Sequence, residues 1–233
     1  MAERKGTSGG VRRRRRPHPT ADEMLVRERD LWAGGAKHVA GIDEVGIGPL
    51  AGPVVAAAVV LPREVGMEGV RDSKTLSKKQ RERLDGEIRS VAIGIGLGVV
   101  SPDEVDRLNP YHAGLRAMQL AVRALPGRPD HLLIDAREIP GVETPQTSIV
   151  AGDKIVRAIA AASIVAKVHR DALMQEIDRS YPGYGFARHV GYATAAHLEA
   201  LRRLGPCPVH RRSYAPVRAL LGTTPPPDDR LGN

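Results

Sequence analysis

The chain has 233 residues, 42% of them hydrophobic, which predicts one domain with a sizeable core and tails. Its one cysteine, Cys207, excludes a disulfide framework and a multi-cysteine zinc site. A lone thiol is typical of a reducing compartment, so we expect a cytoplasmic protein. No apolar run approaches membrane-spanning length, and no apolar segment follows the N-terminal arginines, so we expect neither a membrane span nor a secretory signal.

The net charge of +8 is concentrated at the N-terminus. Residues 1–19 carry seven basic side chains against one acid, Glu3, so six of the eight net positive charges lie there. Five consecutive arginines among Gly, Ser and Pro predict a disordered arm. Such an arm either binds nucleic-acid phosphates or is a solvated tail without a dedicated partner, and charge alone does not decide between these.

We therefore divide the chain into three parts. Residues 1–35 are the basic arm, with a short helix over 22–32; residues 36–221 are the folded domain; residues 222–233 are a tail. Within the domain, Val-rich runs bounded by Gly and Pro predict strands over 39–43 and 54–61. The segment between them, residues 46–53, is called the glycine loop below, and its shortness predicts an antiparallel pair.

The middle of the chain alternates clear helix and strand signals. Ser77 and Gln80 form a capping-box pattern that opens a helix over 78–89. Residues 92–100 alternate glycine with Ile, Leu and Val, which predicts a strand with one bare face covered by a helix. Ser101 and Pro102 begin another helical segment, and a further helix covers 111–125.

The later segments are a strand over 131–135, a short strand at 149–150, and a long helix over 154–179. Thr194 caps a helix that ends at Gly205, and residues 213–216 open a last short one. This order predicts an α/β domain with a mixed central sheet flanked by helices and a helical C-terminal part.

Acids follow three of the predicted strands: Asp43 and Glu44, then Asp135, then Asp153. Each aspartate alone is best explained as a cap or turn former. Together, strand-end carboxylates that meet at one sheet edge favour Mg²⁺ or Mn²⁺, which prefer oxygen ligands. Two such ions can activate water and stabilise the leaving oxygen of a phosphodiester.

The glycine loop permits two interpretations. A dinucleotide-binding fingerprint is excluded, because a strand-like Val/Ala run follows the loop instead of a helix. Backbone amides brought close to a polymer backbone are the better explanation.

These motifs together resemble the ribonuclease HII family, in order, over about residues 39–217. The segments that carry the resemblance are 41–53, 72–74, 133–135, 152–153, 161–171, 181–186, 189–194 and 210–216. The resemblance implies an RNase H-like fold in an endonuclease that requires Mn²⁺ or Mg²⁺, and we expect a monomer. Its substrates would be RNA–DNA hybrids and duplex DNA with single embedded ribonucleotides, cut 5′ of the ribonucleotide to leave a 3′-hydroxyl.

Carried over by motif, Asp43, Glu44, Asp135 and Asp153 correspond to the metal-binding carboxylates of the family. Asp171 is a rival for the fourth position, and we interpret it as structural because an Arg-Asp pair in a helix is usually a scaffold feature.

By the same resemblance, Tyr192 packs on the sugar at the RNA–DNA junction, with a half-buried core tyrosine as the alternative. Gly46, Ile47 and Gly48 match the loop that reads the 2′-hydroxyl largely through backbone groups. The candidates for phosphate contact are Lys74, Lys167, Arg188, Arg211 and Arg212.

Three residues depart from the family pattern: Ile47 stands where arginine is expected, Val45 replaces alanine, and Ala136 replaces glycine. One lost charged contact costs about 1.5–3 kcal/mol, so Ile47, together with the arginine arm, motivates an alternative in which the chain binds nucleic acid with impaired catalysis. All four acids are present, so an active nuclease is the stronger hypothesis. A different metal-dependent phosphotransferase on the same fold is a third possibility.

Overall fold

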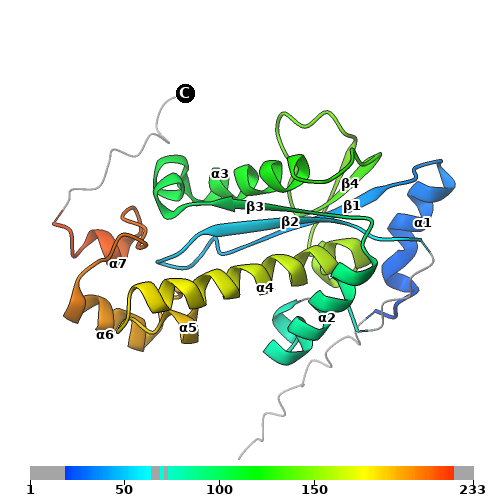
Figure 1. The fold of residues 1–233 in the computed structure, drawn as a ribbon. Helices are drawn as coiled ribbons and strands as arrows, with labels where there is room; N and C mark the ends of the chain where they lie inside the picture. The colour runs from blue at the N-terminus through cyan, green and yellow to red at the C-terminus, as the bar shows by residue number, and fades with distance from the viewer. Residues whose placement is uncertain (1–18, 64–68, 71–72, 223–233) are drawn as a thin grey trace, which may run out of the picture.

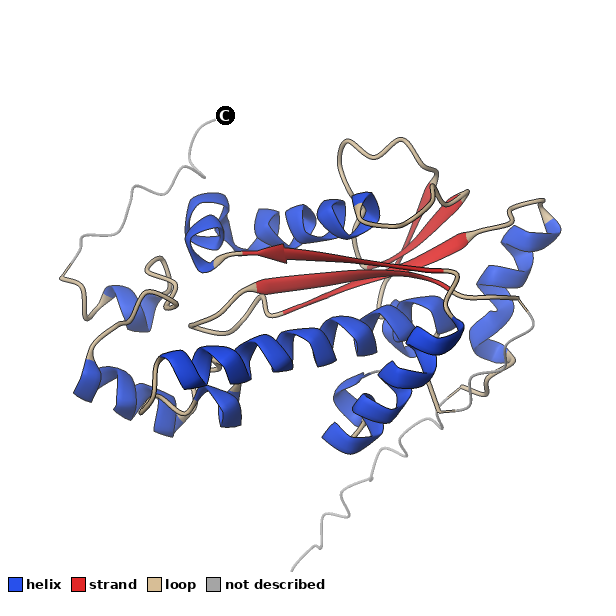
Figure 2. Cartoon of the chain, in the orientation of Figure 1, coloured by secondary structure: helices blue, strands red, loops and turns tan. Residues whose placement is uncertain are grey.

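The computed structural model describes residues 19–63, 69–70 and 73–222. The arginine-rich arm over 1–18, the tail after 222, and Asp72 lie outside the described residues. Five strands form one sheet in the order β3-β2-β1-β4-β5 (Figures 1 and 2). Their bounds are β1 Val39–Val45, β2 Val54–Val60, β3 Gly94–Val100, β4 His131–Asp135 and β5 Gln146–Ile149.

The sheet is mixed. β1 pairs antiparallel with β2, as the short glycine loop predicts, and β2 also pairs antiparallel with β3. β1 pairs in parallel with β4, and β4 with β5. In the β1–β4 register Ile42 is the partner of Ile134, so the next residues, Asp43 and Asp135, lie beside each other at the same level of the sheet.

Helices cover both faces (Figure 1). α3 packs on one face, mainly against β2 and β3, while α4 packs on the other against β1 and β2, with α2 outside it. Small alanines of β2 alternate between two apolar cores, with Ala57 on the α4 side and Ala56 on the α3 side. The helices are η1 Glu23–Leu25, α1 Val26–Ala33, η2 Ser73–Thr75, α2 Lys78–Val91, α3 Pro102–Arg123, η3 Gly152–Lys154, α4 Arg157–Ser180, α5 Phe186–His189, α6 Ala195–Leu204 and α7 Ala215–Arg218.

The bare face of β3 is covered by a helix, as its glycines predict. A Cβ at Gly96 would lie 2.0 Å from the Ala121 carbonyl oxygen, and one at Gly98 would lie 2.0 Å from the Ala117 carbonyl oxygen. The backbone of α3 therefore lies directly on this strand, and any larger residue would push the helix away.

The predicted helix starts are confirmed at both capping boxes, Ser77 with Gln80 and Ser101 with Glu104. Within α3, Asn109 has φ 63° and ψ 162°, immediately before Pro110. Because a proline disfavours helical backbone in the residue before it, this break divides α3 into the two segments that the sequence predicts.

Several predicted boundaries are wrong. β1 continues two residues past Asp43 because Val45 still pairs with Val55 of β2. β5 ends at Ile149, so Val150 lies in an exposed turn. α4 begins at Arg157 instead of 154, after the η3 turn, and short α5 was not predicted.

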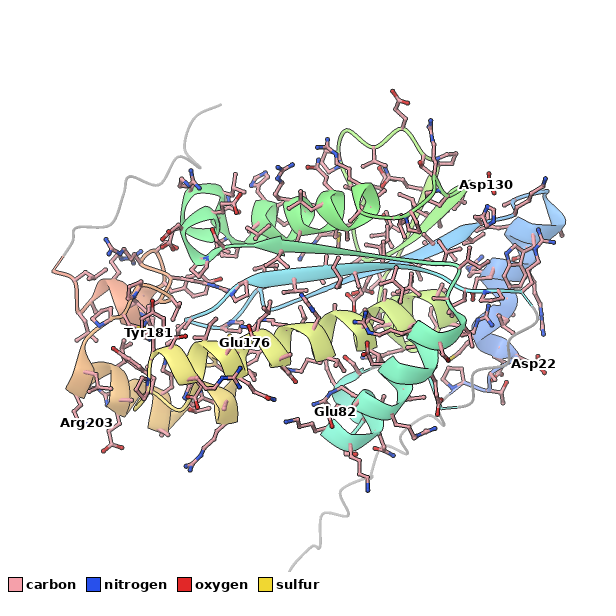
Figure 3. The ribbon with its side chains drawn as sticks, viewed as in Figure 1. Asp22, Glu82, Asp130, Glu176, Tyr181 and Arg203 are labelled. Atoms are coloured by element: carbon pink, nitrogen blue, oxygen red, sulfur yellow. The ribbon has the colours of Figure 1, made fainter. Side chains whose placement is uncertain are left out.

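The C-terminal part is helical, as predicted, and α1 joins the domain through a buried ion pair. Arg157 Nη2 of α4 lies 3.2 Å from Glu28 Oε1 of α1, and both side chains are almost fully buried. Figure 3 shows many charged side chains at the outside of the fold, among them Asp22, Glu82 and Arg203. Within the described ranges, no helix combines the length and apolar character needed to cross a membrane.

Candidate active site

Asp43 and Glu44 lie inside β1 and not at its end, which corrects the expected strand boundary. Because successive residues of a strand point to opposite faces, the two side chains diverge. Asp43 accepts a hydrogen bond from Ser163 of α4. Glu44 lies on the α3 side, where Arg137 Nη1 is 3.6 Å from its Oε1. The pair therefore reaches both faces of the sheet from one point on the strand.

Asp135 and Asp153 approach the same point from β4 and from η3. Asp135 ends β4 and accepts a hydrogen bond of 2.7 Å from the Gly152 amide. Asp153 is 3% exposed and lies in η3; it is not at the start of α4, because the N-cap there is Val156. Lys74, from η2, places its Nζ 3.7 Å from Asp153 Oδ2, and its side chain is 80% exposed.

The acid cluster, defined as Asp43, Glu44, Asp135 and Asp153, shares one electrostatic environment. Burial raises the pKa of Asp43 well above its ordinary value, and the negative charges of Glu44, Asp135 and Asp153 raise it further, against the Ser163 hydrogen bond. Burial also raises the pKa of Glu44, with Arg137 opposing and Asp135 adding to the shift. The cluster therefore holds more negative charge than its surroundings compensate.

The donor set of the acid cluster is all carboxylate oxygen, which suits a hard divalent cation. Among residues 19–63, 69–70 and 73–222, no group of three or more His, Cys, Asp or Glu side chains is already arranged to hold a metal ion. The negative charges of Glu44, Asp135 and Asp153, which add to the effect of burial in raising the pKa of Asp43, are nevertheless what a bound cation would balance. The acid cluster therefore fits a divalent cation by chemistry and charge, with side-chain adjustment on binding.

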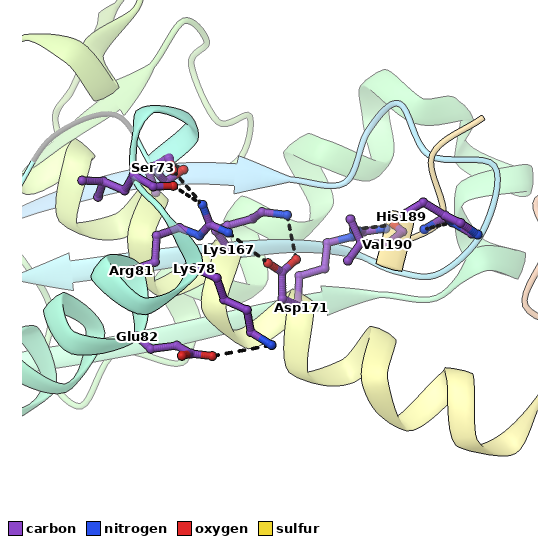
Figure 4. Close-up of polar contacts among 12 residues, drawn as sticks. Ser73, Lys78, Arg81, Glu82, Lys167, Asp171, His189 and Val190 are labelled. Carbon is purple, nitrogen blue, oxygen red and sulfur yellow. Dashed lines mark hydrogen bonds and ion pairs between the residues drawn. The ribbon is translucent and has the colours of Figure 1, made fainter. Parts of the chain in front are cut away.

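Asp171 lies in a separate, fully paired network (Figure 4). Its carboxylate is 2.7 Å from Lys167 Nζ of the same helix and 3.7 Å from Arg81 Nη2 of α2. Arg81 also donates to the Ser73 and Leu76 carbonyls. These contacts hold α2 and η2 against α4, so Asp171 and Lys167 serve the scaffold.

The glycine loop is braced from inside by Arg211, which is 0% exposed. Its guanidinium donates to the carbonyls of Gly46, Ile47, Pro49 and Gly52 at 2.6–3.0 Å. An arginine buried in this way cannot bind a substrate phosphate, so Arg211 drops out of the candidates for phosphate contact.

The direction of these carbonyls decides what the loop presents outward. In a trans peptide the N–H points opposite to the C=O, so the amides of Ile47 and Gly48 face away from Arg211. Neither amide donates a hydrogen bond to any part of the chain that the structure describes. The loop therefore presents two free donors beside Glu44.

A second arginine, Arg170 of α4, is equally buried and donates to Pro53, Ala51 and Val190 carbonyls at 2.9–3.3 Å. Burial, and then the nearby charge of Arg211, lower its pKa to about 10, so it stays charged at neutral pH. Neither arginine forms an ion pair with a described residue. The sequence motifs contain both residues, but nothing in the spacing indicates that they would bind backbone.

Tyr192 lies beside the loop: its Cε1 would be 3.7 Å from a Cβ at Gly48, and the residue is 44% exposed. This exposure argues against a core tyrosine. His197 Nδ1 is 2.9 Å from the Tyr192 carbonyl oxygen and so acts as the donor. His210 must then donate through Nε2 to His197, 3.1 Å away, leaving Nδ1 to accept from the Cys207 amide. Two buried neutral histidines thus fix the backbone of Tyr192.

Ile47 turns its side chain toward α3. Its Cδ1 would lie 2.9 Å from a Cβ at Gly114, and its carbonyl accepts from both Arg211 and Tyr214. Ala136, where the family pattern has glycine, takes φ 60°.

Sequence reasoning gave no role to Ser163, Arg137 or Arg170, although Ser163 and Arg170 lie in motifs that carry the resemblance.

The family model described as Ribonuclease HII matches residues 40–217. A protein named Ribonuclease HII from Anaeromyxobacter sp. is 52% identical over 202 residues, covering 87% of this chain and 64% of the relative. One from Geobacillus kaustophilus is 52% identical over 200 residues, covering 86% of this chain and 76% of the relative.

Solved structures agree on the fold. The crystal structure of ribonuclease H2 from Pyrococcus horikoshii superposes with a TM-score of 0.67 and 25% identity, covering 78% of this chain and 96% of that one. RNase HII of Archaeoglobus fulgidus, solved in a complex with PCNA, gives 0.64 and 27%, with 75% and 93% coverage. A Bst-RNase HIII structure with Mn²⁺ gives 0.62 at 21% identity, covering 80% and 70%, which supports the fold alone. The RNase H-like fold and the family resemblance are confirmed.

Proposed function

Because this chain belongs to the ribonuclease HII family and is an enzyme of the ribonuclease H type, we propose that it cleaves the RNA strand of RNA–DNA hybrids and cuts 5′ of single ribonucleotides in duplex DNA. The observation that carries the proposal is the meeting of two features at one end of β1. A carboxylate cluster with uncompensated charge lies next to a braced loop with two outward amides.

In this proposal Asp43, Glu44, Asp135 and Asp153 hold Mn²⁺ or Mg²⁺. Divalent cations held there would activate the attacking water and stabilise the leaving oxygen. Ser163 fixes the Asp43 carboxylate by its hydrogen bond, and the Gly152 amide fixes that of Asp135. Both acids are thereby oriented before substrate arrives.

Substrate selection falls to the glycine loop and Tyr192. The free amides of Ile47 and Gly48 can donate to a 2′-hydroxyl, which only the ribonucleotide has. Gly48 keeps the surface open to the Tyr192 ring, which then packs on the neighbouring deoxyribose. Lys74 would contact the phosphate backbone; its large exposure and its position next to Asp153 support this role. We further propose that the enzyme acts as a monomer in the cytoplasm.

The test uses the full chain with a duplex carrying one ribonucleotide, in Mn²⁺ or Mg²⁺, beside an all-DNA duplex of the same sequence. We expect one cut, 5′ of the ribonucleotide, with a 3′-hydroxyl product, and no cut in the all-DNA duplex. Folded protein that leaves the ribonucleotide duplex intact would contradict the proposal. Equal cleavage of both duplexes would indicate a less selective phosphodiesterase.

Ile47 favours one alternative, a nucleic-acid-binding module with impaired catalysis, because the loop carries no side-chain charge at this position. That alternative requires binding of the ribonucleotide duplex without cleavage. Recovery of cleavage by Ile47→Arg would support it.

A further inference from the structure

Arg137 has no established part in the site, yet the chain directs it there. Two residues after Asp135, the backbone turns through Ala136 at φ 60°, and the Arg137 amide donates to the Asp135 carbonyl at 2.8 Å. A non-glycine residue in this left-handed region is uncommon and costs about 1–3 kcal/mol. The turn brings the Arg137 guanidinium beside Glu44 at the end of the acid cluster.

The guanidinium of Arg137 is left unsatisfied. Its Nη1 is 3.6 Å from Glu44 Oε1, which is beyond hydrogen-bond length, and this atom is buried without a partner. None of its nitrogens donates a hydrogen bond to a residue within the described ranges. An arginine has five N–H donors, and leaving a buried charged donor unmade is expensive. The side chain is 32% exposed, so the rest of the group reaches the surface.

An aromatic ring also contacts Arg137, besides the distant Glu44 carboxylate. Its guanidinium carbon lies 4.8 Å from the centroid of the Tyr111 ring, and Tyr111 is 50% exposed. The side chains of Ile47, Arg137 and Glu44 all approach Gly114 of α3. A Cβ there would lie 2.9 Å from Ile47 Cδ1, 3.6 Å from Arg137 Nη1 and 3.8 Å from Glu44 Cγ. Arg137 therefore borders both the acid cluster and the glycine loop.

We propose that Arg137 binds a phosphodiester oxygen of the nucleic-acid substrate, on the α3 side of the acid cluster. The planar fork of a guanidinium suits two phosphate oxygens, and stacking on Tyr111 orients it before the substrate arrives. At the neighbouring loop position Ile47 offers no charge, so Arg137 supplies the cation for this part of the substrate. The proposal rests on the proposed function and adds a substrate-binding residue to it.

The competing explanation is that Arg137 only neutralises Glu44. The 3.6 Å separation without a hydrogen bond makes it a poor partner for that purpose. The two explanations differ in what removal of the charge would change. A phosphate ligand affects duplex affinity and its salt dependence, whereas a Glu44 partner affects the divalent-cation requirement.

The experiment compares wild type with Arg137→Gln and Arg137→Lys. The control is Arg128→Gln, which removes another arginine with a 3.6 Å ion pair, to Glu143, at an exposed position. Duplex binding is measured by fluorescence anisotropy without divalent metal at several salt concentrations. Cleavage of the ribonucleotide duplex is measured across a Mn²⁺ titration.

For Arg137→Gln we expect about tenfold weaker duplex binding and a salt slope lower by about one, with the Mn²⁺ half-saturation and melting temperature unchanged. Arg137→Lys should recover part of the affinity, and Arg128→Gln should match wild type. Unchanged affinity and slope with a shifted Mn²⁺ half-saturation would overturn the proposal. The metal-free binding measurement decides about Arg137 even where wild type fails to cleave, so the two proposals can fail separately.

Discussion

The acid cluster and the pair of arginines behind the glycine loop are two buried charged groups at one end of β1, and they are stabilised differently. Arg170 and Arg211 are fully buried cations without ion pairs among the described residues, yet their guanidinium groups donate to backbone carbonyls. The four acids are also largely buried, and this burial, with the negative charges of Glu44, Asp135 and Asp153 adding to it, raises the pKa of Asp43. The loop is complete in the free protein, whereas the cluster carries a charge that only a cation can balance.

This difference distinguishes a structural role of the two buried arginines from the proposed catalytic role of the acid cluster. A self-satisfied loop presents its amides in a fixed geometry before substrate arrives, which lowers the entropy lost on binding. The negative charges of the acid cluster are not neutralised by the protein alone, and a bound metal cation would neutralise them. Changes in the cluster should therefore affect activity more than stability, and changes in the arginine pair the reverse.

The largest effect is expected from Asp43→Asn. Loss of this carboxylate should lower the cleavage rate on the order of a thousandfold, corresponding to about 4 kcal/mol of transition-state stabilisation. Because the substitution also removes a repelling buried charge, the free energy of unfolding at pH 7 should rise or stay level. Single-turnover cleavage and urea denaturation measure the two quantities. A large loss of stability would contradict the distinction between the two regions.

The converse is Arg211→Met, which leaves four loop carbonyls without their main donor. Breaking such a buried network should lower the free energy of unfolding by about 3–5 kcal/mol. Arg212→Met, at the exposed neighbouring position, is the matched control and should stay within about 0.5 kcal/mol. Urea denaturation checks both variants. A change below about 1 kcal/mol in Arg211→Met would show that the loop does not depend on this brace.

The pH dependence of stability tests the raised pKa values in the acid cluster, with a smaller expected effect than the two substitutions above. The raised folded-state pKa values of Asp43 and Glu44 mean that the folded state holds more protons than the unfolded state above pH 3.8 and 4.5. Their contribution to stability is therefore present at low pH and lost as pH rises through the folded values. The difference between the melting temperatures of wild type and Asp43→Asn, followed as a function of pH, isolates the contribution of Asp43. A difference independent of pH would contradict the raised pKa.

His210 should act in the opposite direction. Burial, and then His197, lower its pKa from 6.5 to about 4. A histidine kept neutral by the fold contributes stability that is present above pH 6.5 and lost as pH falls toward 4. Replacing His210 with Gln should reduce this acid sensitivity of the melting temperature. Unaltered sensitivity would indicate that His210 is not the group responsible.

The smallest effect is expected from Ile47→Arg. In the proposed function the loop acts through amides whose direction Arg211 sets, so a new side chain should change cleavage by less than about threefold. A gain above tenfold, measured as kcat/KM on the ribonucleotide duplex, would favour the impaired-catalysis alternative and place the missing charge at position 47.

Local patterns predicted the elements well where one signal dominates. The Ser77–Gln80 capping box, the N-cap at Ser101 and the alternating glycines of β3 each have a short-range cause, and each is found as expected. The end of β1 was misplaced because two charged residues interrupt the apolar run at Asp43 and Glu44. The strand continues through them, since the register of the sheet pairs Val45 with Val55. β5 was misplaced because Gln146 and Thr147 are polar residues that pair with β4.

In the candidate site, too, features with a local cause could be predicted from the sequence, and features that depend on distant contacts could not. Acids after apolar runs could be found from the sequence, and the β1–β4 register brings Asp43 level with Asp135. The use of an arginine to bind carbonyls instead of phosphate could not be found, because both uses place the same residue in the same motif. Arg137 was missed for a related reason: its place beside Glu44 depends on one unusual backbone angle at Ala136.

The most direct test of the unbalanced charge in the acid cluster is a calorimetric titration of the full chain with Mn²⁺, in two buffers of different ionisation enthalpy, at a mildly acidic pH. Carboxylates with raised pKa values must lose protons to bind metal. We expect Mn²⁺ binding with proton release in wild type, and strongly reduced binding and release in Asp43→Asn. Equal Mn²⁺ binding by the two proteins, or none by either, would contradict the account.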